Sequence, residues 1–377
     1  MIPLNSKLSA LERSGIRKYT NLARQTPDCI SLALGEPDFD TPQAIKAAAI
    51  AALQEGKTHY AMNQGDPELR KAISHYETKR GFACTPEQIL VTAGATGALF
   101  TAMLGILNPG DEIIIPQPSY VCYEPMTRLA GGVPVIVNTK AENDFKLTPC
   151  EIKAALSPKT KAIILNSPNN PTGAVYSKES LAAVKAAVLE KPIFVICDNV
   201  YQQLCNAPCP DFSLDVQLRG QVLLCQSFSK PYAMTGWRIG YLAGPQEIMD
   251  RLLLLHAAEV AAIPTFLQSA CITALNTDVS SMANTYAQRR SYVCSRLQKM
   301  GLSFPKPEGA FYVFADIRKF GLDSDTFCTR MIQEAKVAAV PGTCFGAEGY
   351  IRLSCACSDS LLLKALDRME TFIQTQK

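Results

Sequence analysis

A lysine and an arginine stand close together in a segment that could bind an anion and support covalent chemistry. The motif SFSK ends on Lys230, and Arg238 follows eight residues later beside Trp237, the only tryptophan of the chain. A lysine amine becomes a nucleophile when desolvation or neighbouring cations remove its proton. An arginine guanidinium binds a phosphate or a carboxylate through paired hydrogen bonds. Most single lysines are solvated surface residues, but the serines of SFSK together with Arg238 favour a ligand site.

Three further segments place small or polar residues directly after apolar runs. They are the turn AGATG (residues 93–97) after Ile89–Thr92, the turn SPNNPTG (residues 167–173) after Lys161–Asn166, and Asp198 after Ile193–Cys197. Taken singly, each is more often an ordinary turn or a helix cap. Ligands of open α/β sheets bind outside the carboxyl ends of the strands, so we expect these segments to lie around one site.

The elements that must position these residues alternate along the middle of the chain. Short β-rich runs are expected at Ile89–Thr92, Glu112–Ile115, Pro134–Val137, Lys161–Asn166, Ile193–Cys197 and Gln221–Cys225. Several are continuously apolar, as is typical of strands that are covered on both faces. Helical patterns such as Ala95–Leu107 and Lys178–Leu189 lie between them. This alternation predicts an α/β domain with a mostly parallel sheet.

The two ends of the chain have a different character. Residues before about Thr41 indicate an irregular arm after one short helix, and the part beyond about Asn276 predicts a charged helix (Tyr286–Met300), a strand (Gly309–Asp316) and a closing helix from Ser358. Terminal pieces of this kind often pack together into one smaller domain.

The composition narrows the class of protein. The chain has 377 residues, 47% of them hydrophobic, and its 37 basic and 34 acidic side chains leave a net charge of +3. Such a small charge does not indicate a nucleic-acid partner or an anionic membrane. The longest nearly apolar run, Gly97–Leu107, is too short to cross a bilayer, and the first residues lack a secretory pattern. We therefore expect a soluble cytoplasmic protein.

The 14 cysteines and three histidines disfavour two other kinds of site. The cysteines are scattered and none are spaced C-x-x-C, so we expect no metal site and instead small buried thiols in a reducing compartment. The shortage of histidine and the lack of a G-x-S-x-G motif disfavour hydrolases that rely on a Ser–His or Cys–His pair.

Five motifs occur in the order and at the spacing of one known family. They are NPTG from Asn170, D-x-x-Y from Asp198, S-x-S-K ending at Lys230, G-W-R-x-G around Arg238, and a late arginine, Arg352. On these motifs essentially the whole chain resembles the class I aminotransferases of the pyridoxal-phosphate (PLP) fold-type I superfamily. The resemblance implies a large PLP-binding domain over 46–275 and a smaller α+β domain, with the N-terminal arm, formed by 1–45 and 276–377.

The resemblance also implies the catalytic contacts. Lys230 would hold PLP as an imine and, once an amino acid displaces it, would move the α-proton. Asp198 would keep the pyridine nitrogen protonated, because a carboxylate beside the ring N–H stabilises the charged form. Tyr201 would donate to the phenolate oxygen of the cofactor, and Asn170 would contact the same oxygen.

The remaining cofactor contacts are implied in the same way. The phosphate ligands would be the Ala95 backbone N–H, Thr96, Ser227, Ser229 and Arg238. Tyr120 matches the aromatic residue that stacks on the ring. Tyr60 matches a tyrosine that reaches the phosphate from the other subunit, so the resemblance implies a homodimer with shared active sites.

The resemblance implies fewer contacts with the substrate than with the cofactor. By resemblance, Arg352 would bind the α-carboxylate, with the Gly35 backbone and Asn170 nearby. Phe311 and Phe345 either line the substrate pocket or belong to the core.

Two segments guide the choice of branch within the family. The segments SGIRK (residues 14–18) and MTGWR (residues 234–238) are most similar to the branch with aromatic, aspartate and N-acetyl-diaminopimelate aminotransferases. Their shared co-substrate pair, glutamate and 2-oxoglutarate, requires a second cation in the site. Arg17 is a candidate, although an exposed helix arginine explains it equally well.

Two alternatives remain at this point. The same cofactor contacts would serve a PLP-dependent C–S β-lyase, because the carbanion that releases an amino group can also expel a β-leaving group. A PLP-binding regulatory domain without turnover is less favoured, since the chain has neither the spare length nor the basic patch for a DNA-binding module.

Overall fold

The central feature of the fold is a seven-stranded sheet. The computed structural model describes residues 2, 5–11, 15–189, 191–205 and 208–376. The strands are β2 (Ile89–Thr92), β3 (Glu112–Gln117), β4 (Val133–Asn138), β5 (Thr160–Asn166), β6 (Phe194–Asp198), β7 (Val222–Ser227) and β8 (Gly240–Ala243). Their order is β2-β8-β7-β6-β5-β3-β4. Only β8 runs antiparallel to its neighbours, β2 and β7.

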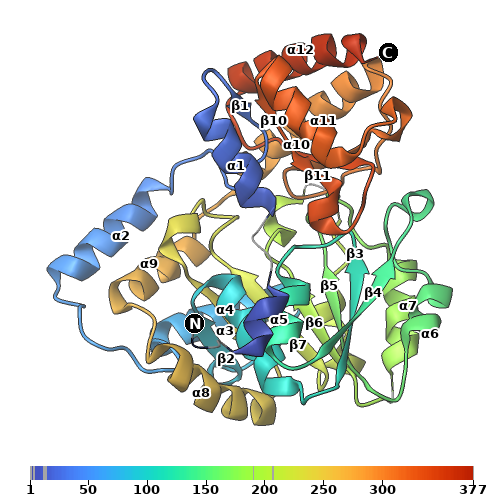
Figure 1. Cartoon of the computed structure of the whole chain (residues 1–377). Helices are drawn as coiled ribbons and strands as arrows, with labels where there is room; N and C mark the ends of the chain where they lie inside the picture. Colours follow the sequence, from blue (N-terminus) through green and yellow to red (C-terminus); the bar gives the residue numbers. More distant parts are fainter. Residues whose placement is uncertain (1, 3–4, 12–14, 190, 206–207, 377) are drawn as a thin grey trace.

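Helices cover both faces of this sheet (Figure 1). One face packs on α4 (Gly94–Ile106), α5 (Tyr123–Leu129) and α8 (Gln246–Val260). The other packs on α3 (Pro67–Arg80), α6 (Pro149–Ala155), α7 (Lys178–Val188) and α9 (Thr265–Leu275), and α2 (Gln43–Gln54) lies on α9. In β5, Ile164 faces the first layer and Ile163 the second. Burial on both faces is why these strands are continuously apolar.

The two ends of the chain share a second hydrophobic core. It contains α1 (Gly15–Gln25), α10 (Ser280–Lys299), α11 (Ser324–Arg330), a π-helical turn (Met331–Ala335) and α12 (Asp359–Thr375). Its strands are β1 (Ile30–Ser31) parallel to β10 (Val337–Ala338), and β9 (Tyr312–Asp316), β11 (Val340–Pro341) and β12 (Tyr350–Ser354) in an antiparallel sheet of order β11-β12-β9. In Figure 1 these elements lie above the large sheet. The domain limits at residues 45 and 276 stay a prediction, which this shared core supports.

Short 3-10 turns complete the described elements. They are Ser6–Ala10, Pro86–Gln88, Ala141–Asn143, Gln202–Leu204, Phe212–Leu214, Val216–Leu218, Thr235–Trp237, Arg318–Phe320 and Gly342–Phe345. Within the described ranges, no helix combines the length and the apolarity needed to span a membrane.

The α/β class with a mostly parallel sheet is confirmed, and the six predicted strands lie within one or two residues of β2 to β7. Three features differ from expectation. The sequence analysis missed β8, which has only four residues and begins at the last glycine of the G-W-R-x-G motif. The helix α10 begins at Ser280, six residues before Tyr286. The N-terminal arm is more regular than predicted, since β1 after α1 pairs with β10.

Candidate active site

The carboxyl ends of the parallel strands border a cavity of about 260 Å³. Asn166 ends β5, Asp198 ends β6 and Ser227 ends β7, and Asn166 pairs in register with Asp198. The predicted site residues among its lining are Gly35, Ala95, Thr96, Tyr120, Asn170, Asp198, Tyr201, Ser227, Ser229, Lys230, Arg238 and Arg352. The tertiary structure therefore gathers these twelve predicted residues around one cavity.

Lys230 follows β7, and its side chain lines this cavity together with Arg238 and Arg352. Burial is the main cause that lowers the pKa of Lys230 to about 8, and the positive charges of Arg352 and Arg238 act in the same direction against the opposing effect of Glu36. Its Nζ donates to the carbonyl oxygen of Gly35 at 2.6 Å. At this pKa about a tenth of the amine is unprotonated at pH 7, far more than for a solvated lysine, and this form is the one that a nucleophile or a general base requires.

The Asp198 carboxylate has one satisfied and one unsatisfied oxygen. Its Oδ2 accepts a hydrogen bond from the Tyr123 hydroxyl at 2.6 Å, whereas Oδ1 is buried without a partner. Burial raises the pKa of Asp198 to about 6, and the Tyr123 hydrogen bond opposes that shift. A buried acceptor without a donor is costly, so this oxygen fits a ligand that brings its own N–H.

Two tyrosines, one beside Asp198 and one beside Tyr201, were missed by the sequence analysis as site residues. Tyr123 holds the carboxylate of Asp198, and its only signal was its place three residues after Tyr120. Tyr312 lines the cavity and shares a hydrogen bond of 2.9 Å with the Tyr201 hydroxyl. The Tyr201 phenol is thus positioned by a residue 111 positions later in the chain, which no local pattern announces.

The anion-binding end of the cavity lies at the start of α4. The first turn contains Ala95 and Thr96, and no side chain caps its N-terminus. The Arg238 guanidinium lies against this turn, since a Cβ added to Gly94 would stand 3.0 Å from its Nη2. Gly94 also has φ +71°, a conformation that favours glycine. Free N–H groups at a helix N-terminus beside an arginine suit a phosphate dianion.

The Arg352 guanidinium, in β12, also lines the cavity. The residue is only 1% exposed, and it donates to Asn170 Oδ1 at 2.8 Å and to the Ala33 carbonyl oxygen at 2.7 Å. The rings of Tyr312 and Phe345 lie 4.5 and 4.9 Å from its guanidinium carbon. Among the described residues no carboxylate forms an ion pair with Arg352, and its Nε is buried without a partner. A buried cation in this state fits an incoming carboxylate.

Four other residues considered in the sequence analysis do not line the cavity. Tyr60 is 89% exposed and stands outside the cavity. Arg17 is exposed on α1, although its neighbour Ile16 lines the cavity. Phe311 and Phe345 were left open between pocket and core, and both belong to the buried core formed by the chain ends.

The residues present fit PLP. The orphaned Asp198 oxygen matches the ring N–H, the start of α4 with Arg238 matches the phosphate, and the depressed pKa of Lys230 matches the group that binds an aldehyde. When bound, PLP supplies an electron-withdrawing ring that stabilises the negative charge left on a substrate Cα.

Comparison with known proteins agrees with this geometry. The family description "Aminotransferase class I and II" matches residues 27–369. A probable N-acetyl-LL-diaminopimelate aminotransferase of Bacillus subtilis is 42% identical, over 98% of this chain and 95% of its own. An aromatic-amino-acid aminotransferase of Thermococcus litoralis is 39% identical, over 99% of each chain. The structure of Thermus thermophilus aspartate aminotransferase with maleate superposes with a TM-score of 0.94 at 38% identity, over 98% of this chain and 100% of that one.

Proposed function

Because the chain belongs to the class I and II aminotransferase family, and is thus a PLP-dependent aminotransferase, we propose that it moves the amino group of an L-amino acid to a 2-oxo acid in a ping-pong cycle. We further propose that glutamate and 2-oxoglutarate form one substrate pair. The observation that supports this best is that Lys230, Asp198 and Arg352 border one cavity. The comparisons support amino transfer rather than the C–S lyase reaction, since the relatives are described as aminotransferases.

Each residue has a role that follows from its environment. Arg352 binds the substrate α-carboxylate, because it is a buried cation with no carboxylate partner among the described residues. Asp198 holds the proton of the ring nitrogen through its free Oδ1. Lys230 takes the α-proton from the substrate and returns it, as an amine with a pKa of about 8 can do near neutral pH. Tyr201 orients the ring through its hydroxyl, which Tyr312 holds in place.

The identity of the amino donor depends on which residue binds a second carboxylate of the substrate, distal to its α-carboxylate. The cations that line the cavity among the described residues are Lys230, Arg238 and Arg352, and all three have other roles. We therefore retain Arg17 as the candidate for a distal carboxylate, because it follows Ile16 at the cavity wall. A dicarboxylate substrate is supported by the Thermus relative, whose structure contains maleate.

The function is tested by half-reactions with single amino acids. Each is mixed with the yellow holoenzyme, and the loss of visible absorbance measures conversion to pyridoxamine phosphate. Glutamate together with aspartate or with an aromatic amino acid is expected to react, and 2-oxoglutarate should restore the absorbance. Pyruvate and ammonia formed from cystathionine without any oxo acid would instead support the lyase.

We also propose that the protein is a homodimer in which Tyr60 serves the active site of the partner. Tyr60 is 89% exposed and lies in a surface hollow with Phe266, so its hydroxyl is free to reach a second copy. A location in the cytoplasm stays a prediction from the sequence.

Mixing two variants tests this arrangement. Tyr60→Phe removes one hydrogen bond to a charged phosphate, so kcat/KM should fall by about tenfold. Adding an excess of Lys230→Ala protein should then raise the activity per Tyr60→Phe subunit by nearly the same factor, because each mixed dimer has one intact site. If Tyr60 served the site of its own subunit, the added protein would change nothing.

A further inference from the structure

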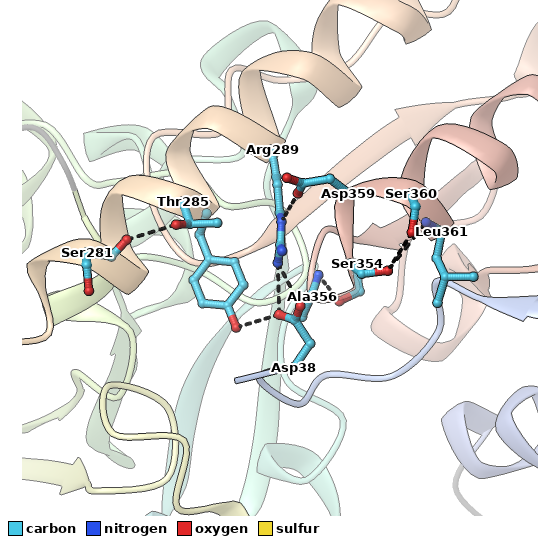
Figure 2. A network of polar contacts seen from close by, with 11 residues as sticks. Asp38, Ser281, Thr285, Arg289, Ser354, Ala356, Asp359, Ser360 and Leu361 are labelled. Carbon is cyan, nitrogen blue, oxygen red and sulfur yellow. Dashed lines mark hydrogen bonds and ion pairs between the residues drawn. The ribbon is translucent and has the colours of Figure 1, made fainter. Parts of the chain in front are cut away.

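Arg289 of α10 links two carboxylates from distant parts of the chain (Figure 2). Its Nη1 donates to both oxygens of Asp38 at 2.9 Å, and its Nε donates to Asp359 Oδ1 at 2.7 Å. The Tyr286 hydroxyl donates to the same Asp38 carboxylate at 3.1 Å, and the guanidinium carbon lies 5.6 Å from the centre of the Phe39 ring. The Arg289 side chain is 10% exposed, so this contact is largely shielded from water.

The two halves of this link differ in burial. The Asp38 side chain is 22% exposed, whereas that of Asp359 is 83% exposed. Exposed ion pairs contribute little, because water screens them. The contact between Arg289 and Asp38 is therefore the half that can hold a segment in place.

Asp38 terminates a segment whose Gly35 lines the candidate active site. In this segment, residues 33–38, the Ala33 carbonyl oxygen accepts a hydrogen bond from Arg352 at 2.7 Å and the Gly35 carbonyl oxygen accepts one from Lys230 at 2.6 Å. The Gly35 backbone also lies against Tyr312, since an added Cβ would stand 2.5 Å from its hydroxyl. Three contacts of the segment thus reach the cavity, and the Arg289 ion pair anchors its far end.

We propose that Arg289, through Asp38, is a positioning residue that keeps residues 33–38 in the conformation that binds the substrate carboxylate. This inference rests on the proposed function, in which Arg352 and Gly35 receive that carboxylate. Loss of the anchor would let the Gly35 backbone move away from Tyr312 and weaken binding of substrate and transition state alike. Such a loss raises KM and leaves kcat nearly unchanged.

The chain offers a matched control on the same helix. Arg296 also bridges two carboxylates, with Nη2 at 2.7 Å from Asp367 and 2.8 Å from Glu370, and its side chain is 12% exposed. Both partners belong to α12, and neither touches residues 33–38. Arg289→Gln and Arg296→Gln therefore remove equally buried arginines of α10, but only the first releases the segment. Asp38→Asn and Asp359→Asn separate the two halves of the Arg289 link in the same way.

The experiment compares steady-state kinetics of these four variants as PLP-loaded enzymes. We expect Arg289→Gln and Asp38→Asn to raise KM for the amino donor by about tenfold, with kcat within threefold of wild type. Arg296→Gln and Asp359→Asn should leave KM within twofold. Arg289→Lys keeps one charged donor and should recover part of the loss. The dissociation constant of a 2-methyl amino acid, which has no α-proton, should rise in parallel with KM and reports binding without turnover.

Two further measurements keep the outcomes distinct. The double variant Asp38→Asn with Arg289→Gln should be no worse than either single variant, because the two residues act as one unit. Urea unfolding of all variants shows whether a rise in KM merely follows lost stability. An unchanged KM in Arg289→Gln, or an equal rise in Arg296→Gln, would overturn the inference while the wild type still transaminates. A wild type that transfers no amino group would refute the proposed function instead.

Discussion

Lys230→Ala should lower kcat for amino transfer by about 10⁴-fold or more, because one side chain provides both the covalent link to the cofactor and the proton transfer. The variant should still bind PLP, since Asp198 and the α4 terminus with Arg238 remain. Borohydride should fix the chromophore on the wild-type chain at Lys230 and leave none on the variant. Single-turnover absorbance and peptide mass spectrometry measure these two results.

A matched lysine provides the control for this variant. Lys319 also has its Nζ held by backbone carbonyl oxygens, those of Met300 and Gly301, and it does not line the cavity. Lys319→Ala should retain wild-type kcat and the borohydride label. In addition, the apoprotein should form its chromophore faster as pH rises through about 8, because only the unprotonated amine attacks an aldehyde. A Lys230→Ala protein that transaminates at the wild-type rate would eliminate the proposed mechanism.

Asp198→Asn should lower kcat by about 10²- to 10³-fold, as is typical when a charge aimed at the reacting system is removed. The same variant should make the apoprotein more stable at pH 7 to 8. Burial raises the pKa of Asp198 to about 6, above the value of about 4 of an unfolded chain. The folded chain therefore binds a proton more strongly than the unfolded chain, and the contribution of Asp198 to stability is lost as pH rises through about 6.

The size of that stability gain depends on pH in a defined way. Above pH 6 the buried charge costs up to about 3 kcal/mol, so Asp198→Asn should show nearly this gain in urea unfolding of the apoprotein. The gain should shrink between pH 6 and pH 4, where the wild-type carboxyl is also neutral. Tyr123→Phe removes the hydrogen bond that lowers the pKa of Asp198, and it should move this window to higher pH. A gain that is equal at pH 4 and pH 8 would refute the assignment.

Both predictions have one physical origin. Asp198 and Lys230 are buried in the absence of a ligand. Burial disfavours the charged form of each, so it raises the pKa of Asp198 and lowers the pKa of Lys230. An apoprotein that contains such groups is less stable than its packing alone would make it, and a ligand of complementary charge restores that stability. Binding of PLP should therefore stabilise wild type more strongly than Asp198→Asn.

Much of the large domain could be predicted because its signals are local. The runs that became β5 and β6 are apolar at consecutive positions, a pattern that burial on both faces requires. Because the carboxyl ends of parallel strands lie at one edge of a sheet, the residues at or just after the ends of β5, β6 and β7, which include Asn170, Asp198 and Lys230, could be placed together from the sequence. The strand β8 was missed although β2 is equally short, because β8 begins with a glycine and has no β-branched residue, whereas β2 (ILVT) has three.

Other features depended on contacts between residues that are far apart in the chain. Tyr312 positions Tyr201 across 111 residues, and Arg289 holds Asp38 across 251. No periodicity or motif links such partners, because their distance is set by how the chain ends pack on the large sheet.

The residue types along the chain therefore determined the class of fold and the chemistry available at its strand ends. The tertiary structure alone decided which oxygen of Asp198 stays free, how far the pKa of Lys230 falls, and which residues hold the segment that contains Gly35. These properties follow from desolvation and three-dimensional neighbours, which a linear sequence does not specify.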